Sequence, residues 1–401
     1  MNDKELLKDT LAIVLAGGKG ERLYPLTRDR AKPAVPFGGM YRIIDFTLSN
    51  CLNSGLRKIV VLTQYKSISL GRHLNLAWNI FNYQLGEFII SIPPQQRVGD
   101  YWYEGTADAV YQNIYTLDEV KPRFVLILSG DHVYTMDYRE MLKYHVRKRA
   151  DVTVGCVEVD RSEGRRMGIV EIDGTGRMTA FIEKPKIPKT IPGKKDKSLA
   201  SMGVYVFNTE TLVREVIRDK KAANSSHDFG KDVIPRMFKR DEVYGYSVSS
   251  YWRDVGTVDA YYRSNMDLLE SHCTLDLNAP DWPIRTHMEQ LPAAKVINGS
   301  RRQHGAIVDS ILSPGCVIRG ATVKHSILCY GVRVDEGSVV EDCVLLGKVE
   351  VGKRCYLKNT IIDKRVRVPD GHKIGSDRNH DLRNFTVTES GIVVVPKDCK
   401  I

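Results

Sequence analysis

The sequence predicts an α/β fold up to about residue 270 and a parallel β-helix after about residue 300. Two observations carry this prediction. In the first part, short β-rich runs alternate with helix-like segments, a pattern typical of a mostly parallel sheet covered by helices. In the second part, aliphatic residues recur nearly every six positions, which is too long a period for a helix face and is the signature of stacked hexapeptide coils.

The expected sheet is built from short apolar runs that end in glycine, polar or turn residues. In a sheet of this kind, ligands bind outside the carboxyl ends of the strands. Helical patterns occupy Asp108–Leu117 and Asp137–Arg149. The expected strands are Leu11–Ala16, Lys58–Thr63, Phe124–Ser129, Val152–Val159, Gly168–Ile172 and Gly203–Phe207.

The expected β-helix has an imperfect register, because three of its steps fit only as five residues. Four cysteines lie among the coils, at positions 316, 329, 343 and 355, and we expect them to pack as small apolar residues. The repeating aliphatic positions are Val317, Val323, Leu328, Val334, Val340, Leu346, Val351, Leu357, Ile362, Val368 and Ile374.

These patterns divide the chain into three segments. Residues 1–270 form the expected sheet domain, and residues 301–401 form the expected β-helix domain. Between them, residues 271–300 carry Pro280, Pro283 and Pro292 with little periodicity, and we expect this segment to be a linker.

Composition narrows the class of protein. A chain of 401 residues that is 42% hydrophobic can bury a large core. No apolar run approaches the ~20 residues of a membrane span, and no signal peptide or CxxC motif is seen, so we expect no membrane partner and a cytoplasmic location. The net charge of +10 favours anionic partners. The lysine-rich run at 183–197 is broken by prolines and holds no aromatic residue, so we expect a solvated loop and no nucleic-acid partner.

The most informative motif is LAGGKGERL at residues 15–23. Its glycines follow an apolar strand and allow consecutive backbone N–H groups to converge on phosphate oxygens. Lys19 and Arg22 add positive charge, and Lys32 follows within a segment short enough to fold back over the same phosphates. The loop matches neither GxxxxGK[ST] nor GxGxxG, so it predicts a polyphosphate site of another kind.

Nine blocks in order resemble bacterial glucose-1-phosphate adenylyltransferase, the ADP-glucose pyrophosphorylase of glycogen synthesis. The resemblance implies a Rossmann-like nucleotidyltransferase domain, a left-handed β-helix and a homotetramer. It also implies that ATP and α-D-glucose 1-phosphate are converted to ADP-glucose and pyrophosphate with Mg²⁺. The blocks are LAGGKGERL with AKPAVPFGG, YRIIDFTLSNCLNSG, WYEGTADAVYQN, LSGDHVY, FIEKP, SLASMGVYVF, SSHDFGKDVIP, YWRDVGT and WPIRT.

The resemblance also implies roles for individual residues. Arg22, Lys32 and Asp131 are the implied catalytic residues, with Asp131 and Asp254 as the metal ligands, although Asp254 could instead pair with Arg253. Leu15, Ala16, Gly17, Gly18 and Gln64 are implied to bind ATP. The implied glucose 1-phosphate site consists of Tyr103, Gly168, Glu183, Lys184 and Ser201.

Small-molecule allosteric effectors are a further implication of the resemblance. Arg30, Arg42 and Lys364 match basic positions that the family uses for anionic effectors between its two domains. Relatives activated by fructose 1,6-bisphosphate have a lysine where this chain has Asp29. We therefore expect weak or no activation by that bisphosphate, with Asp29 paired to Arg28 or Arg30, or simply solvated.

Four other functions are compatible with parts of the sequence. A pyrophosphorylase for another nucleotide or sugar phosphate would share the glycine-rich loop. A non-catalytic regulatory subunit is expected to have lost Asp131, Arg22 or Lys184, and all three are present. A hexapeptide acyltransferase is disfavoured by the short repeat domain. A hydrolase using Ser129, His132, His227 or Asp228 is disfavoured because the chain lacks a nucleophile elbow around these residues.

Overall fold

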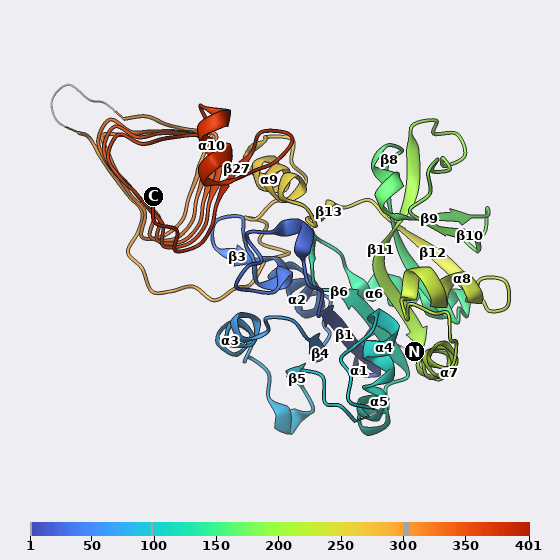
Figure 1. The fold of residues 1–401 in the computed structure, drawn as a ribbon. Coiled ribbons are helices and arrows are strands. Elements are labelled where there is room, and N and C mark those ends of the chain that lie inside the picture. Colours follow the sequence, from blue (N-terminus) through green and yellow to red (C-terminus); the bar gives the residue numbers. More distant parts are fainter. Residues whose placement is uncertain (1, 98, 300–304) are drawn as a thin grey trace.

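The computed structural model describes residues 2–97, 99–299 and 305–401, and it contains both expected architectures (Figure 1). A twisted sheet with helices on both faces occupies the N-terminal part, and a stack of triangular coils occupies the C-terminal part. The path through the sheet runs β10 (Met178–Glu183), β9 (Gly168–Ile172), β11 (Lys197–Asn208), β6 (Phe124–Ser129), β1 (Thr10–Ala16), β4 (Lys58–Thr63) and β5 (Phe88–Ile92), with β8 (Val152–Asp160) and β12 (Val243–Val248) joined beside β11.

Strands β6, β1, β4 and β5 are parallel neighbours, as the alternating pattern predicted. Strand β11 runs antiparallel to β6 and β8 and begins at Lys197, six residues before the expected Gly203. Its pairing with β8 shifts between Ser201 and Tyr205, and Gly203 has a φ of +68° in this irregularity. A run read as one short strand is therefore a long strand with a glycine-containing bulge.

The two faces of the sheet are covered by different helices. Cores of apolar side chains unite one face with α1 (Asp3–Lys8), α2 (Ile43–Asn53), α3 (Ile68–Ala77) and α6 (Tyr138–Lys148). The other face packs against α4 (Thr106–Tyr111), α5 (Ile114–Val120), α7 (Thr209–Lys220) and α8 (Ile234–Met237). Helix α6 agrees with the expected Asp137–Arg149, since Asp137 caps its start and Arg149 its end in the left-handed conformation.

The helix expected at Asp108–Leu117 is wrong as a single element, because α4 ends at Tyr111 and α5 begins at Ile114. The interruption lies at Asn113, whose side-chain amide donates to the Ala109 carbonyl at 2.7 Å and to the Tyr103 hydroxyl at 2.9 Å. A side chain that bonds locally to the backbone competes with helix continuation. The break also fixes Tyr103, which lies in the pocket described below.

The coils of the β-helix stack through parallel strand pairs. Val317 pairs with Arg333, and Thr322 pairs with Val339, so successive coils are offset by 16 or 17 residues rather than by three full hexapeptides. This offset explains the five-residue steps. All the repeating aliphatic positions are buried except Val317, which is half-buried, and Cys316, Cys329, Cys343 and Cys355 are buried and free.

Two sheets make up most of these coils. One contains β14 (Lys295–Ile297), β17 (Val317–Arg319), β20 (Arg333–Val334), β22 (Glu350–Val351) and β24 (Arg367–Val368). The other contains β15 (Ile307–Val308), β16 (Ile311–Leu312), β18 (Thr322–Lys324), β19 (Ile327–Leu328), β21 (Val339–Leu345), β23 (Tyr356–Ile362), β25 (Lys373–Ile374), β26 (Thr386–Val387) and β27 (Val393–Val395).

The segment between the two parts is held along helix α2. Trp282 donates its indole N–H to Asn50 at 2.9 Å, Asn53 donates to the Pro283 carbonyl at 3.0 Å, and the Arg285 N–H donates to Ser49 at 2.8 Å. Strand β14, which lies inside the segment expected as linker, already pairs with β17 of the β-helix. The linker is therefore held near residues 282–285 and by β14, whereas residues 287–290 and 292–296 are exposed.

A shared apolar core joins the β-helix to the sheet domain. It combines side chains from residues 23–46 and from helix α9 (Val258–Met266) with Cys329, Val344, Leu346 and Ile361 of the coils. In Figure 1, α9 and the blue N-terminal segment containing β2 (Pro36–Phe37) and β3 (Tyr41–Arg42) lie between the two parts. The segment that follows the glycine-rich loop thus touches both domains.

Candidate active site

A cavity of about 980 Å³ opens at the carboxyl ends of β1, β4 and β6. The glycine-rich loop follows β1, Gln64 follows β4, and Asp131 follows β6, so three separate strand ends meet at one edge of the sheet. The cavity lining includes all the residues expected for catalysis, ATP, glucose 1-phosphate and metal. None of the three expected effector residues lines it.

The glycine-rich loop is open towards this cavity. A Cβ on Gly18 would meet no atom within 4 Å, whereas one on Gly17 would lie 3.1 Å from the Gln64 Cβ. Gly20 has a φ of +66°, a conformation that side-chain-bearing residues rarely adopt, and its carbonyl accepts a hydrogen bond from the Thr27 hydroxyl at 2.8 Å. The loop is therefore held at its far end while Gly18 leaves room for close approach by a ligand.

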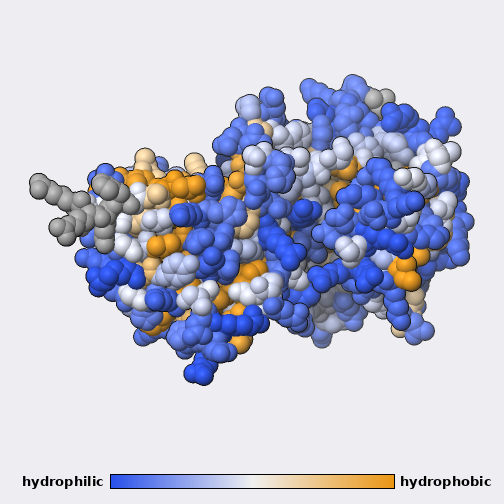
Figure 2. All heavy atoms as spheres, turned by 90° about the horizontal axis from the view of Figure 1, so that it is seen from above, coloured by the Kyte–Doolittle hydropathy of each residue, from blue (hydrophilic) through white to orange (hydrophobic). Residues whose placement is uncertain are grey.

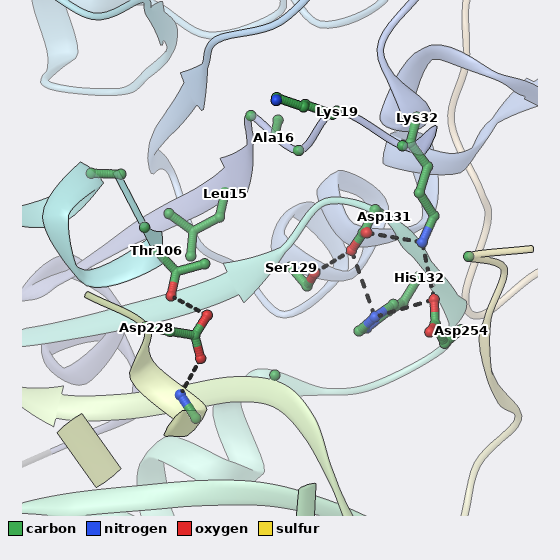
Figure 3. A pocket seen from close by; sticks show the side chains of 18 of the residues that line it. Leu15, Ala16, Lys19, Lys32, Thr106, Ser129, Asp131, His132, Asp228 and Asp254 are labelled. Atoms are coloured by element: carbon green, nitrogen blue, oxygen red, sulfur yellow. Dashed lines mark hydrogen bonds and ion pairs between the residues drawn. The ribbon is translucent and has the colours of Figure 1, made fainter. Parts of the chain in front are cut away.

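Asp131 and Asp254 lie on either side of the Lys32 ammonium (Figure 3). Lys32 Nζ is 2.9 Å from Asp131 Oδ2 and 2.9 Å from Asp254 Oδ1. Asp254 ends strand β13 (Trp252–Asp254), which pairs antiparallel with β7 (His132–Tyr134) and so brings it beside the β6–β7 turn. The alternative pairing of Asp254 with Arg253 is wrong, because Asp254 pairs with Lys32 and Arg253 pairs with Asp267.

The electrostatics of this cluster keep both carboxyl groups ionised. Burial acts to raise the pKa of Asp131, but the Lys32 ammonium and then His132 outweigh it and hold that pKa well below its usual range. The pKa of Asp254 is lowered in the same way, against burial and the repulsion of Asp131. Burial lowers the pKa of Lys32, and the two carboxylates reverse this effect and raise it. The cluster is thus two carboxylates with one ammonium between them.

His132 and Trp252 belong to this cluster although the sequence did not single them out for it. His132 Nε2 lies 3.6 Å from Asp131 Oδ1 and 3.9 Å from Asp254 Oδ1, and the imidazole packs edge-on against Trp252 at 5.1 Å. Both residues are the immediate neighbours of expected site residues in LSGDHVY and YWRDVGT, which is the signal that could have found them. Ser129 hydrogen-bonds Asp131 rather than His132, so no serine–histidine nucleophile pair forms here.

The expected sugar-phosphate residues gather on strands β9, β10 and β11. Gly168 pairs with Glu183, and a Cβ at Gly168 would lie 2.6 Å from the Phe181 ring and 3.0 Å from Glu183 Oε2. Lys184 Nζ is 3.0 Å from Glu183 Oε1, and its side chain is 54% exposed. Ser201 lies on β11 within 3.4 Å of the Tyr205 hydroxyl. These groups offer one exposed ammonium, paired with Glu183, and several oxygen atoms along the wall of the cavity.

Asp228 and Thr106 are further pocket residues that the sequence did not assign. The Asp228 carboxylate accepts from the Thr106 hydroxyl at 3.1 Å and from the backbone N–H groups of Gly230 and Lys231 (Figure 3). Asp228 is therefore the N-cap of the helical turn Phe229–Val233. The two preceding serines make other contacts, Ser225 with Asp219 and Ser226 with Asp232. The contact ties the start of α4 directly to the segment at 225–230 in the wall of the cavity.

The three expected effector residues meet between the two domains. Arg30 is buried and forms a bidentate ion pair with Asp363, with its shortest contact at 2.9 Å. Burial, followed by repulsion from Arg42 and Arg30, lowers the pKa of Lys364 to about 7. Arg42 donates to Ser69, and Lys364 lies over the Tyr330 ring. Asp29 pairs with Arg28 at 3.1 Å, one of the two partners expected for it.

Among the described residues, no group of three or more histidine, cysteine or acidic side chains is arranged to hold a metal ion by itself. A metal at Asp131 and Asp254 would have to complete its coordination with ligand oxygens and water, the usual manner of Mg²⁺. In the same described parts of the chain, no helix combines the length and apolarity that crossing a bilayer requires.

Comparison with known proteins identifies the family. The nucleotidyl transferase family matches residues 11–271, and the family described as GlmU-like, C-terminal hexapeptide matches residues 292–395. A protein of Vibrio cholerae serotype O1 named glucose-1-phosphate adenylyltransferase 2 is 48% identical over 400 residues, covering 98% of both chains. The chain belongs to the glucose-1-phosphate adenylyltransferase family.

Other relatives agree over nearly the whole length. The glucose-1-phosphate adenylyltransferase of Nitrosococcus oceani is 49% identical, covering 97% of this chain and 94% of its own. That of Koribacter versatilis is 47% identical, covering 97% and 96%. The family assignment confirms a nucleotidyltransferase enzyme, and the hexapeptide match with the stacked parallel coils confirms the left-handed β-helix.

Proposed function

We propose that this chain transfers the adenylyl group of ATP to α-D-glucose 1-phosphate, giving ADP-glucose and pyrophosphate. One observation carries the proposal: the glycine-rich loop, the carboxylate pair and the glucose 1-phosphate residues line a single cavity. Relatives that bear the name of this activity are 47–49% identical over nearly the entire chain. A binding protein without catalysis is disfavoured, because Arg22, Lys32, Asp131 and Lys184 all line that cavity.

In the proposed reaction, a phosphate oxygen of glucose 1-phosphate attacks the α-phosphorus of ATP in line. The new P–O bond forms as the bond to the β-phosphate oxygen breaks, and pyrophosphate leaves with the electron pair. The protein's contribution is to align the two substrates and neutralise charge. The departing pyrophosphate needs hydrogen-bond donors and positive charge. The N–H groups of residues 17–20, with Arg22 and Lys32, are suited to this role because they line the cavity at the glycine-rich loop.

We further propose that the metal is Mg²⁺, held by Asp131 and Asp254. The donor set fits, because both carboxyl groups are ionised and a buried ammonium already lies between them where a cation is required. One or two carboxylates with substrate phosphates is the usual protein site for Mg²⁺. When bound, the metal would supply electrostatic stabilisation of the phosphate charge.

On the sugar side, Lys184 is suited to the phosphate and Glu183 to the hydroxyl groups. The Lys184 ammonium is exposed and its only described ion-pair partner is the adjacent Glu183, so an incoming phosphate can compete for it. Tyr103 presents an aromatic ring, and its hydroxyl is held by Asn113 at 2.9 Å. Gly168 and Ser201 also line the cavity, where their small size leaves room for the sugar.

A substrate panel tests the proposal. Pyrophosphate release is measured with ATP, GTP, CTP, UTP and dTTP against glucose 1-phosphate and glucosamine 1-phosphate. Release should be fastest with ATP and glucose 1-phosphate, and the sugar product should be ADP-glucose by mass spectrometry. Faster release with UTP or with glucosamine 1-phosphate would assign the chain to a different pyrophosphorylase reaction.

We also propose regulation by small anions at Arg30, Arg42 and Lys364, and a cytoplasmic homotetramer that supplies ADP-glucose for glycogen synthesis. The cluster of cations between the domains supports an anion site. Figure 2 shows hydrophobic residues gathered over the β-helix, whereas the rest of that face is mostly hydrophilic. In the C-terminal part of the chain, Val296, Val308 and Leu382 are exposed, which supports subunit contacts. Light scattering that gave a monomer at micromolar concentration would contradict the assembly.

A further inference from the structure

The Lys32 ammonium, which the proposed function assigns to the departing pyrophosphate, is held by two carboxylates in this structure. Lys32 is 5% exposed, and its ammonium contacts two carboxylates at 2.9 Å each. Among the described residues, it is the one lysine or arginine that forms an ion pair with Asp131 or Asp254. A side chain of the protein therefore already occupies the position between the two carboxylates and neutralises part of their charge.

The two carboxylates require a cation. They are brought together by the pairing of β13 with β7, and like charges at short range disfavour each other's ionised form. Repulsion from Asp131 acts to raise the pKa of Asp254, and Lys32, followed by His132, outweighs it. Without a metal, Lys32 is the main group that stabilises this arrangement of two ionised side chains.

The Cβ of Lys32 lies beside the glycine-rich loop. A Cβ placed on Gly20 would lie 3.2 Å from the Lys32 Cβ. Its backbone opens the short helical turn Lys32–Ala34, where Pro33 and Ala34 are buried. Because the backbone is anchored and the side chain has four rotatable methylene groups, rotation of the side chain alone can move the ammonium from the carboxylates to the loop.

We propose that Lys32 is an exchangeable counterion, which balances part of the charge of Asp131 and Asp254 in the metal-free protein and turns to the nucleotide phosphates when a divalent metal takes its place. The inference rests on the proposed function, which assigns metal and ATP to this cavity. Lys32 then opposes metal binding to the empty protein, and the nucleotide relieves this opposition by accepting the ammonium. Metal and ATP therefore bind with positive cooperativity.

Binding of Mn²⁺ to the nucleotide-free protein tests the exchange by titration calorimetry. Lys32→Met, which has a similar length and no charge, should bind Mn²⁺ about tenfold more tightly than wild type, because a competing state that lowers the apparent affinity is removed. Lys32→Arg keeps the charge and should bind as weakly as wild type. Lys19→Met is the matched control, because it also removes one positive charge from the lining of the cavity. The Lys19 side chain is 61% exposed and pairs with Glu21 rather than with Asp131 or Asp254.

A second measurement uses the wild-type protein and does not depend on the folding of a variant. Acetylation of lysine side chains is followed by peptide mass spectrometry with and without saturating Mn²⁺. Lys32 should become several times more reactive with Mn²⁺, because its ammonium is released, while Lys197, paired with Asp160 at the surface, should not change. Unchanged reactivity of Lys32 would overturn the proposal.

The outcomes separate this inference from the proposed function. Equal Mn²⁺ affinity in wild type and Lys32→Met, or no binding by Lys32→Met, would overturn the exchange. If Asp131→Asn bound Mn²⁺ as well as wild type, the metal site of the proposed function would itself be wrong. Tighter binding by Lys32→Met, with Lys19→Met unchanged and Asp131→Asn weakened, would support both.

Discussion

Replacing Arg30 with methionine should destabilise the protein far more than replacing Arg28, two residues away. Arg30 and Asp363 bridge the two domains with three contacts of 2.9–3.1 Å, and their side chains are 6% and 1% exposed. Removing the arginine leaves a carboxylate buried without its partner, which typically costs about 3–5 kcal/mol. The Lys364 ammonium lies close enough to Asp363 to offset part of this loss, so we expect about 3 kcal/mol.

Arg28 provides the control because its pair with Asp29 has a similar length of 3.1 Å but side chains that are 40% and 39% exposed. Exposed pairs of this kind contribute roughly 0–1 kcal/mol. Urea unfolding, followed by circular dichroism and tryptophan fluorescence, gives the free energy of unfolding of each variant. A double variant, Arg30→Met with Asp363→Leu, should recover part of the loss because no unpaired charge remains. An Arg30→Met variant as stable as Arg28→Met would refute the reasoning.

Three further predictions concern the sites. Asp131→Asn should fold normally and lose several orders of magnitude in ADP-glucose synthesis, because a fixed anionic metal ligand is removed, and turnover near that of wild type at saturating Mg²⁺ would exclude the assignment. Lys184→Ala should raise the KM for glucose 1-phosphate far more than that for ATP, and the opposite pattern in steady-state kinetics would move Lys184 to the nucleotide side. Micromolar fructose 1,6-bisphosphate should activate weakly or not at all in activity assays, because Asp29 adds a carboxylate beside the effector cation Arg30. Activation by an anion should weaken as pH rises through about 7, where Lys364 loses its charge. The Lys364→Arg variant keeps its charge and should show a flatter pH profile.

Much of the site was predictable because its residues follow recognisable strands. The strand ends before Gly17, Gln64 and Asp131 are set by short apolar runs, and parallel strands bring their carboxyl ends to one edge of a sheet. Asp254 was found by resemblance of its block, since nothing local in YWRDVGT distinguishes a metal ligand from a residue paired to Arg253. His132, Trp252 and Asp228 were missed because their contacts are made to residues distant in sequence or to neighbouring backbone groups.

By itself, the sequence determined three local features of this protein. They are the alternation of strands and helices, the aliphatic repeat of the coils and the glycine-rich loop after β1. These follow from patterns within one element, where each residue's neighbours are known. Tertiary structure alone decided the 16- and 17-residue register of the coils and the partners of Arg30 and Lys32. Such features depend on which distant groups meet, and burial then makes each unpaired charge too costly to leave, so the fold rather than the motif selects the ion pairs.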